Sequence, residues 1–153
     1  LSMVAKNCGG KVPEAGDYAD ADKAMLDQAY GLLTVLRRKA EDQAFHEALE
    51  AVWVVVRAAN GYVDHQAPWA LAKSDTARME TVLYVLAETI RHLALLVQPF
   101  MPDSCGRLLD QLAVASEHRA FADLGPDHAL VPGTALPKPE GVFPRFVEKK
   151  AAS

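Results

Sequence analysis

The sequence predicts an all-α fold, a bundle of about five helices followed by an extended, proline-rich C-terminal tail. Apolar residues recur at steps of three and four over several long segments, which is typical of helices that bury one face. No segment alternates as a strand would, and four prolines lie between Gly125 and Gly141. At 153 residues, we expect one domain over 1–147, in which 125–147 packs on the bundle as the tail and 148–153 is frayed.

The formal net charge is −4 and half of the residues are apolar, which is the balance of an ordinary globular domain. An acidic balance argues against binding nucleic acid through a broad basic face, so any such contact must be local. Cys8 and Cys105 lack the spacing of a disulfide framework or a zinc site, and we expect a reducing, cytoplasmic location. No apolar run reaches transmembrane length and residues 1–7 lack a signal-peptide pattern, so we expect no membrane partner.

The first segments read as helices with clear start and stop signals. Residues 1–7 have the pattern of a helix end, which a pair of glycines then stops. Asp20 or Asp22 can cap the next helix, which runs to about Lys39 with its apolar residues on one face. The basic residues 37–39 suit the negative end of that helix, and we favour this role over a nucleic-acid patch.

A third helix is expected over about 42–63, and its wide apolar face places it near the middle of the bundle. Arg57, Asn60 and Asp64 form a polar stripe near its C-terminal end, at steps of three and four residues. We favour a network in which these groups satisfy one another and hold the following turn. The alternative is that one of them faces a ligand beside Trp69.

A proline–tryptophan pair, Pro68-Trp69, occupies the corner between this helix and the next. Proline fixes its own φ and biases Ala67 away from helix, so the position of the indole ring is largely preset. Either Trp69 plugs the corner of the bundle, as we expect of Trp53 in the third helix, or it is offered to a flat partner. A rigid aromatic ring can stack on unpaired bases, and Lys73 can meet a phosphate. From this local chemistry alone, the buried role is favoured.

The remaining segments complete the bundle. A long helix capped by Ser74 or Asp75 is expected to reach Gln98, where a proline stops it. A further helix is expected over 102–115, with proline in its first turn, and a short helical turn over 118–124.

For four single residues in these segments, the sequence predicts burial or exposure. Met79 is expected in the core, and His92, beside an arginine, is expected to face solvent. In the tail, Phe143 and Phe146 are expected to be tucked into the bundle as anchors.

The sequence contains no catalytic constellation. Its histidines are scattered and lack carboxylate or cysteine partners at ligand spacing: His46, His65, His92, His118 and His128. The nucleophile-elbow, zinc-protease and dinucleotide-binding patterns are absent. We therefore expect no metal, no cofactor and no catalytic residue in this chain.

Three segments, in this order, resemble one family. The first runs from Ala59 to Lys73, with an asparagine followed at a fixed distance by Pro-Trp and a lysine. The others are Leu-Val-Gln-Pro-Phe-Met-Pro at 96–102 and Val-Phe-Pro-Arg-Phe at 142–146. Together they are similar to the methionyl-tRNA synthetase family, and the resemblance covers nearly the whole chain. It identifies the C-terminal, helical anticodon-binding domain of that class I enzyme.

The resemblance implies roles for individual residues. In the family, the Pro-Trp tryptophan stacks on the first base of the CAU anticodon, a cytosine, so Trp69 inherits that role and Pro68 positions it. This reverses the preference for a buried Trp69. The resemblance makes Asn60, Lys73 and Arg57 candidates for contacting the tRNA or for holding the turn. The family's Asn-x-x-x-Arg pair, which also reads the anticodon, would lie just upstream of Leu1.

The resemblance also implies a parent enzyme, an ATP-dependent methionine–tRNA ligase. Its signatures His-Ile-Gly-His and Lys-Met-Ser-Lys-Ser are absent from this chain, as is the zinc-bearing insertion, so ATP and any zinc belong to the parent. The implied partners are the anticodon loop of methionine tRNA and the catalytic domain of the same enzyme. Too few residues follow Val147 for a dimerising domain, so a monomer is expected. The rival hypothesis is a free-standing helical protein-interaction module with Trp69 buried.

Overall fold

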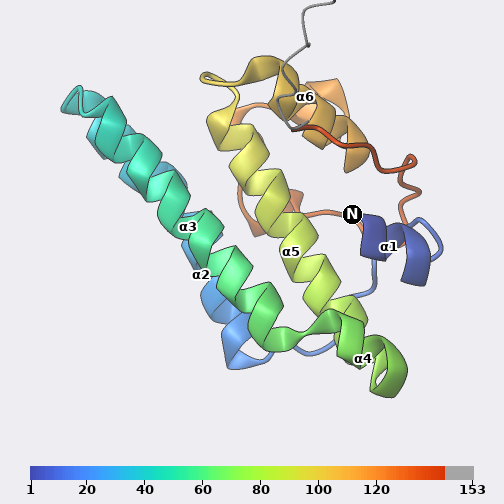
Figure 1. Ribbon diagram of the computed structural model, residues 1–153. Coiled ribbons are helices and arrows are strands. Elements are labelled where there is room, and N and C mark those ends of the chain that lie inside the picture. Colours follow the sequence, from blue (N-terminus) through green and yellow to red (C-terminus); the bar gives the residue numbers. More distant parts are fainter. Residues whose placement is uncertain (144–153) are drawn as a thin grey trace, which may run out of the picture.

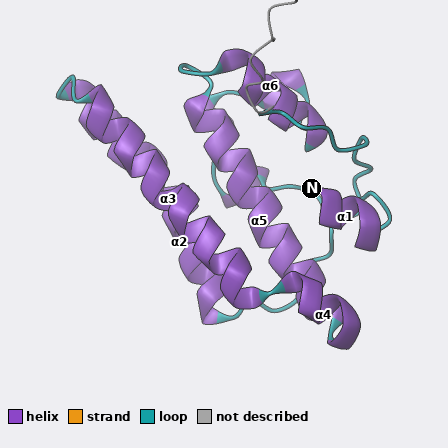
Figure 2. Ribbon diagram, in the orientation of Figure 1, coloured by secondary structure: helices purple, strands orange, loops and turns teal. Residues whose placement is uncertain are grey.

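The computed structural model describes residues 1–143, and the regular structure of this part is helical apart from one isolated β-bridge (Figures 1 and 2). The all-α prediction is confirmed. No helix in these residues is long and apolar enough to cross a membrane. The α-helices are α1 (Ser2–Asn7), α2 (Asp20–Glu41), α3 (Phe45–Gln66), α4 (Pro68–Ser74), α5 (Thr76–Val97) and α6 (Pro102–Gln111), followed by the 3₁₀ turns η1 (Ser116–His118), η2 (Phe121–Asp123) and η3 (Pro126–His128).

Helix α5 forms the centre of the molecule. Figure 1 shows it between the antiparallel pair α2–α3 on one side and α1 and α6 on the other. Most of its side chains are buried, including Met79, Val82, Val85 and Leu95, so the prediction that Met79 belongs to the core is confirmed. A helix that is apolar on nearly every side must be covered on every side, and the other helices and the tail supply that cover.

Three helices, α1, α5 and α6, end or begin at the predicted signals. Helix α2 does not, because Ala19 is its N-cap and Asp22 instead accepts the Ala19 N–H from the first turn of the helix. Gly9 and Gly10 both adopt positive φ after α1, a conformation that glycine takes at little cost. Asp75 caps α5 by accepting a hydrogen bond from the backbone N–H of Arg78 at 3.0 Å. Pro102 stands in the first turn of α6, where its missing N–H costs nothing.

Two helix assignments from the sequence are wrong. Residues 68–74, expected as an irregular corner, form the short helix α4, because proline is suited to a first helical turn. Helix α6 ends at Gln111 and does not reach position 115. Ala113 takes φ of 55°, and the N–H of Val114 turns back to the carbonyl of Leu109 at 3.0 Å, which closes the helix.

The tail, expected to be extended, covers the core in an irregular path that begins with the 3₁₀ turn η3. Tail residues exchange backbone hydrogen bonds with the loop after α1, including Val12 N–H to the carbonyl of Thr134 at 2.8 Å. Leu130 and Val142 are buried, whereas Phe143 is 61% exposed, so Phe143 does not anchor the tail and Val142 does. Phe146, the second expected anchor, lies outside the described residues.

A buried charged cluster on α5 holds the tail in place. Glu88 accepts two hydrogen bonds from Arg91, at 2.9 and 2.6 Å, and a third from the backbone N–H of Leu130 at 3.0 Å. Arg91 also donates to the carbonyls of Asp123 and Gly125. Burial raises the pKa of Glu88, but hydrogen bonds from His92 and Arg91 outweigh it, so the pKa lies below its ordinary value.

The placement of His92 differs from the sequence expectation. It is only 1% exposed, because its Nε2 accepts the backbone N–H of Gly125 at 2.9 Å. Its Nδ1 lies 3.3 Å from the Glu88 side chain, so a neutral ring carries its proton on Nδ1. One partner of His92, Gly125, is 33 residues away in the sequence, and no local pattern reveals it. The other, Glu88, stands four residues earlier on α5, so the expectation that His92 lacks a carboxylate partner at this spacing is wrong.

We expect Glu88→Ala to lower the free energy of unfolding by about 3–5 kcal/mol, because Arg91 is left buried without its counter-charge. Urea denaturation followed by circular dichroism measures this loss. The control is Glu50→Ala, which breaks the exposed pair of Glu50 with Arg57 and should cost less than about 1 kcal/mol. Equal losses in the two variants would contradict the central role of the buried cluster.

Candidate nucleic-acid interface

The corner that carries Trp69 is held by the backbone on both sides of the ring. Ala67 ends α3 in the left-handed region, with φ of 44° and ψ of 59°, and its N–H donates to the carbonyl of Val63 at 3.0 Å. Pro68 follows as the first residue of α4 and is buried. A buried proline ring cannot rotate, so the next residue starts from a fixed direction. In Figure 1, α4 lies at the end of the bundle remote from the α2–α3 turn.

The Trp69 side chain is 53% exposed. Trp69 is therefore accessible to a partner from solvent. The rival picture in which Trp69 is buried is wrong for this chain. A half-exposed ring on a fixed backbone has the geometry that base stacking requires.

Trp53 is also exposed, at 56%, which contradicts the expectation that it is buried. It lies in the middle of α3 and lines an apolar groove of about 350 Å³ together with Met101 and Phe143. From its helical spacing, Trp53 is expected to belong to the wide apolar face of α3. The neighbouring helices cover only part of that face, and the indole lies at its uncovered edge.

The polar residues proposed for the site lie at different distances from the corner along α3 and α4. Lys73 is exposed and stands four residues after Trp69 on α4, so the two side chains share one face of that helix. Asn60 and Arg57 are both exposed on α3. Measured along the helix axis, Asn60 lies about 9 Å and Arg57 about 14 Å from Gln66. The structure thus brings Lys73 beside Trp69 and leaves Arg57 two and a half turns from the corner.

The expected network of Arg57, Asn60 and Asp64 does not form. Arg57 donates a hydrogen bond to Glu50 at 2.6 Å, about two helical turns earlier in α3. Among the residues that the structure describes, no hydrogen bond joins these three side chains to one another, and all three are exposed. Exposed polar groups have water as a partner, so nothing compels them to satisfy one another.

A different network lies beneath the corner, centred on Asp22 at the start of α2. Asp22 is fully buried and accepts hydrogen bonds from Tyr62 of α3, from both terminal nitrogens of Arg78 on α5, and from the N–H of Ala19. Arg78 also donates to the side-chain oxygen of Gln66 at 2.7 Å. The sequence marked Asp22 only as a helix cap, because its partners lie 40 and 56 residues away.

In this network the pKa of Asp22 is lowered and the pKa of Tyr62 is raised. Burial raises the pKa of Asp22, but the hydrogen bonds from Arg78 and Tyr62 outweigh it and hold the pKa below its usual 3.8. Burial and the bond to Asp22 raise the pKa of Tyr62, so its hydroxyl stays protonated and continues to donate. At neutral pH the network is an ion pair with one neutral donor.

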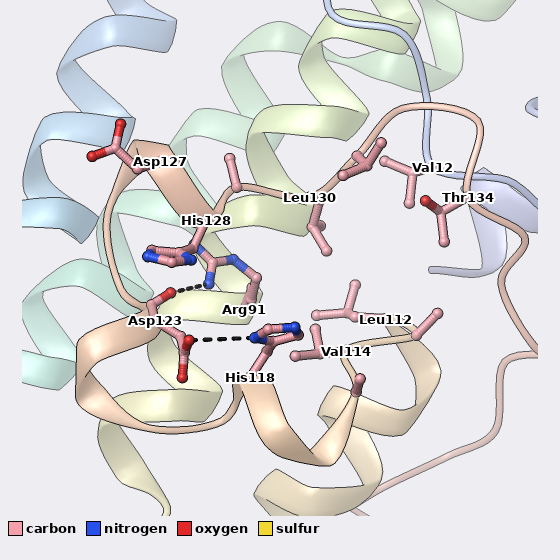
Figure 3. A pocket seen from close by; sticks show the side chains of 14 residues that line it. Val12, Arg91, Leu112, Val114, His118, Asp123, Asp127, His128, Leu130 and Thr134 are labelled. Carbon is pink, nitrogen blue, oxygen red and sulfur yellow. Dashed lines mark hydrogen bonds and ion pairs between the residues drawn. The ribbon is translucent and has the colours of Figure 1, made fainter.

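A second cavity, of about 290 Å³, opens between α5 and the tail (Figure 3). His118, Asp123 and Arg91 face one another there, with the Asp123 carboxylate 3.5 Å from His118 and its carbonyl 2.8 Å from Arg91. These polar groups are each other's partners. Across residues 1–143, no three His, Cys, Asp or Glu side chains come together in a way that could hold a metal ion.

The comparisons with known proteins identify the family of this chain. A family model described as the anticodon binding domain of methionyl tRNA ligase matches residues 12–153. The chain belongs to this family. Within an anticodon-binding domain, the half-exposed tryptophan at the corner is the candidate site, and the cavity beside Arg91 has no such support.

Relatives of this anticodon-binding domain match it over 94% to 100% of its length. The methionine–tRNA ligase of Mesorhizobium japonicum is 55% identical over all of this chain, and that of Mycobacterium tuberculosis is 52% identical over 95% of it. The free-state crystal structure of the Mycobacterium tuberculosis methionyl-tRNA synthetase matches with a TM-score of 0.92 at 50% identity, covering 97% of this chain and 30% of that one. The structure of that enzyme with methionyl-adenylate matches with a TM-score of 0.90 at 52% identity, covering 94% of this chain and 29% of that one. This chain spans about 30% of the length of its Mesorhizobium relative.

We expect the stability of the domain to fall as the pH drops below about 4, because Asp22 has a lowered pKa in the folded state. Its contribution is complete above the unfolded value and is lost as the pH falls through the folded one. Replacing Asp22 with Asn should cost about 3 kcal/mol at pH 7, since Arg78 loses its counter-charge. The difference between the two proteins should shrink towards pH 3. Urea denaturation across this range tests it, and a constant difference would contradict it.

Proposed function

We propose that this domain reads the CAU anticodon of methionine tRNA, with Trp69 stacking on the first base. The observation that carries the proposal is a half-exposed indole next to a buried proline, in a chain of the anticodon-binding family. A base flipped out of the anticodon loop presents a flat apolar face, and stacking on an aromatic ring contributes about 1–3 kcal/mol.

The polar residues near the ring have separate tasks. Lys73, on the same face of α4, is placed to neutralise a phosphate of the loop. Asn60 offers an amide to a base edge from the neighbouring turns of α3, and Arg57 lies farther from the corner, paired with Glu50. A wrong base loses contacts and leaves polar groups without partners, which is a strong source of discrimination. The net charge of −4 fits a local reader that depends little on general attraction to the RNA backbone.

The domain acts as part of a longer methionine–tRNA ligase. The relatives that carry that name are about three times as long as this chain, and one was solved with methionyl-adenylate, the product of methionine and ATP. ATP, methionine and any zinc are therefore bound by the parent's catalytic domain, with which this domain shares a polypeptide. Its own task is to bind and orient the tRNA. We propose a monomeric enzyme in the cytoplasm, in keeping with the free thiols of Cys8 and Cys105.

Trp69→Ala should abolish the preference of the protein for an anticodon stem-loop carrying CAU over one with a changed first base. The affinity for CAU should fall by roughly 5- to 150-fold, the equivalent of one stacked base. Fluorescence anisotropy of labelled stem-loops measures both affinities, with circular dichroism to confirm the fold. The matched control is Trp53→Ala, which removes a second tryptophan of similar exposure from the middle of α3.

Both tryptophan variants should also be tested in the complete ligase, by comparing kcat/KM for the two tRNAs. A Trp53→Ala protein that loses the preference as fully as Trp69→Ala would contradict the special role of the corner. A ligase with no preference at the first base would overturn the proposed function.

Lys73→Ala should weaken the binding of both stem-loops by a similar factor, because a phosphate contact carries no sequence information. The slope of log affinity against log salt concentration should fall by about one unit. The control is Lys23→Ala, an exposed lysine on α2 that should leave affinity and slope unchanged. A variant that lost affinity for one loop alone would show that Lys73 reads a base.

A further inference from the structure

The two ends of α4 are attached to the same residue, Arg78 on α5. At one end, the Arg78 guanidinium donates to the side chain of Gln66 at 2.7 Å, immediately before the left-handed turn at Ala67. At the other end, the Arg78 backbone N–H donates to the side chain of Asp75 at 3.0 Å, and Asp75 is the residue that closes α4. The short helix that carries Trp69 is therefore fixed at both ends from one point.

Arg78 is itself fixed by the buried Asp22. Its two terminal nitrogens meet the two carboxylate oxygens of Asp22, and Tyr62 donates to the same group at 2.5 Å. Asp22 is 0% exposed and the side chain of Arg78 is 21% exposed. A guanidinium held at both nitrogens has one orientation, so its remaining bond to Gln66 has one direction.

Stability alone does not account for this arrangement. A buried ion pair is often no more stabilising than apolar side chains of the same volume. What an Arg–carboxylate pair adds is a defined geometry, since its donors lie in a rigid plane. Here the guanidinium passes that geometry to Gln66, at the start of α4, while the Arg78 backbone N–H holds Asp75 at its other end.

We propose that Arg78, oriented by Asp22, is the positioning residue that sets the angle of the Trp69 ring, with Gln66 as its contact to the corner. The inference rests on the proposed function, in which the ring stacks on the first anticodon base. Stacking weakens when the two planes are tilted or shifted, so a looser α4 lowers discrimination even where the protein remains folded.

Gln66 offers a direct test, because its side chain can be changed while both partners of the ion pair, Asp22 and Arg78, are kept. Gln66→Leu keeps a side chain of similar size but removes the oxygen that accepts the hydrogen bond from Arg78. Gln66→Glu keeps an acceptor oxygen at the same distance from the backbone. The matched control is Tyr84→Phe, which deletes the hydrogen bond from Tyr84 of α5 to the carbonyl of Leu130, away from the corner. Both losses remove one hydrogen bond near α5, so their effects on stability should be similar.

Two readouts separate positioning from simple destabilisation. The first is the ratio of affinities for the CAU stem-loop and the loop with a changed first base, measured with the complete ligase. The second is the fluorescence anisotropy and acrylamide quenching of Trp69 in a domain with Trp53→Phe, which reports the mobility of the ring without RNA. Urea denaturation measures the stability of every variant.

For Gln66→Leu we expect the affinity ratio to fall about three- to tenfold and the Trp69 ring to become more mobile. Gln66→Glu should restore both, and Tyr84→Phe should leave both unchanged. If Gln66→Leu leaves the ratio within twofold of the wild type and the ring equally immobile, the inference is overturned. If the wild type shows no ratio at all, the proposed function fails, and the fluorescence of Trp69 alone then decides whether Arg78 positions it.

Discussion

The structure depends on one constraint, which is that α5 is buried on nearly every side yet carries charged residues. A charged group in the interior must be paired. Arg78 pairs with Asp22 of α2, whereas Glu88 and Arg91 pair with each other on α5 and reach the tail by hydrogen bonds to its backbone. Arg78, in the first turns of α5, meets Asp22 of α2 and Gln66 of α3. The Glu88 cluster, three turns later, fixes the tail. The same requirement therefore determines both the corner that carries Trp69 and the irregular segment that covers the core.

The sequence predicted the helices well because their signals are local. Helical spacing and capping residues placed α2, α3 and α5 to within a few positions, and the cap at Asp75 is where it was expected. The polar clusters could not be predicted in this way. The partners that tie Asp22 and His92 to other elements, Tyr62, Arg78 and Gly125, lie 33 to 56 residues from them, and no pattern in a single sequence joins groups so far apart.

The two tryptophans show that the properties of a single side chain do not identify a binding residue. Trp53 and Trp69 have nearly the same exposed fraction, 56% and 53%, so exposure alone does not select a binding residue. The difference lies in the backbone beneath each ring. Trp53 sits in an unbroken helix and lines an apolar groove, whereas Trp69 follows a buried proline at a turn tied to the Asp22 network. Local chemistry favoured burial for both, and only the family resemblance singled out Trp69.

Ala67 has a consequence for how fast a partner can bind. A left-handed backbone costs a non-glycine residue roughly 1–2 kcal/mol, and glycine would avoid that cost. Glycine would also leave the chain free to visit extended conformations, in which α4 and its ring point elsewhere. With alanine at this position, the left-handed turn is held by the hydrogen bond from the Ala67 N–H to Val63 and by the buried Pro68. In the proposed function, an anticodon loop would then meet a ring that is already in place, and its arrival would be limited by encounter and orientation.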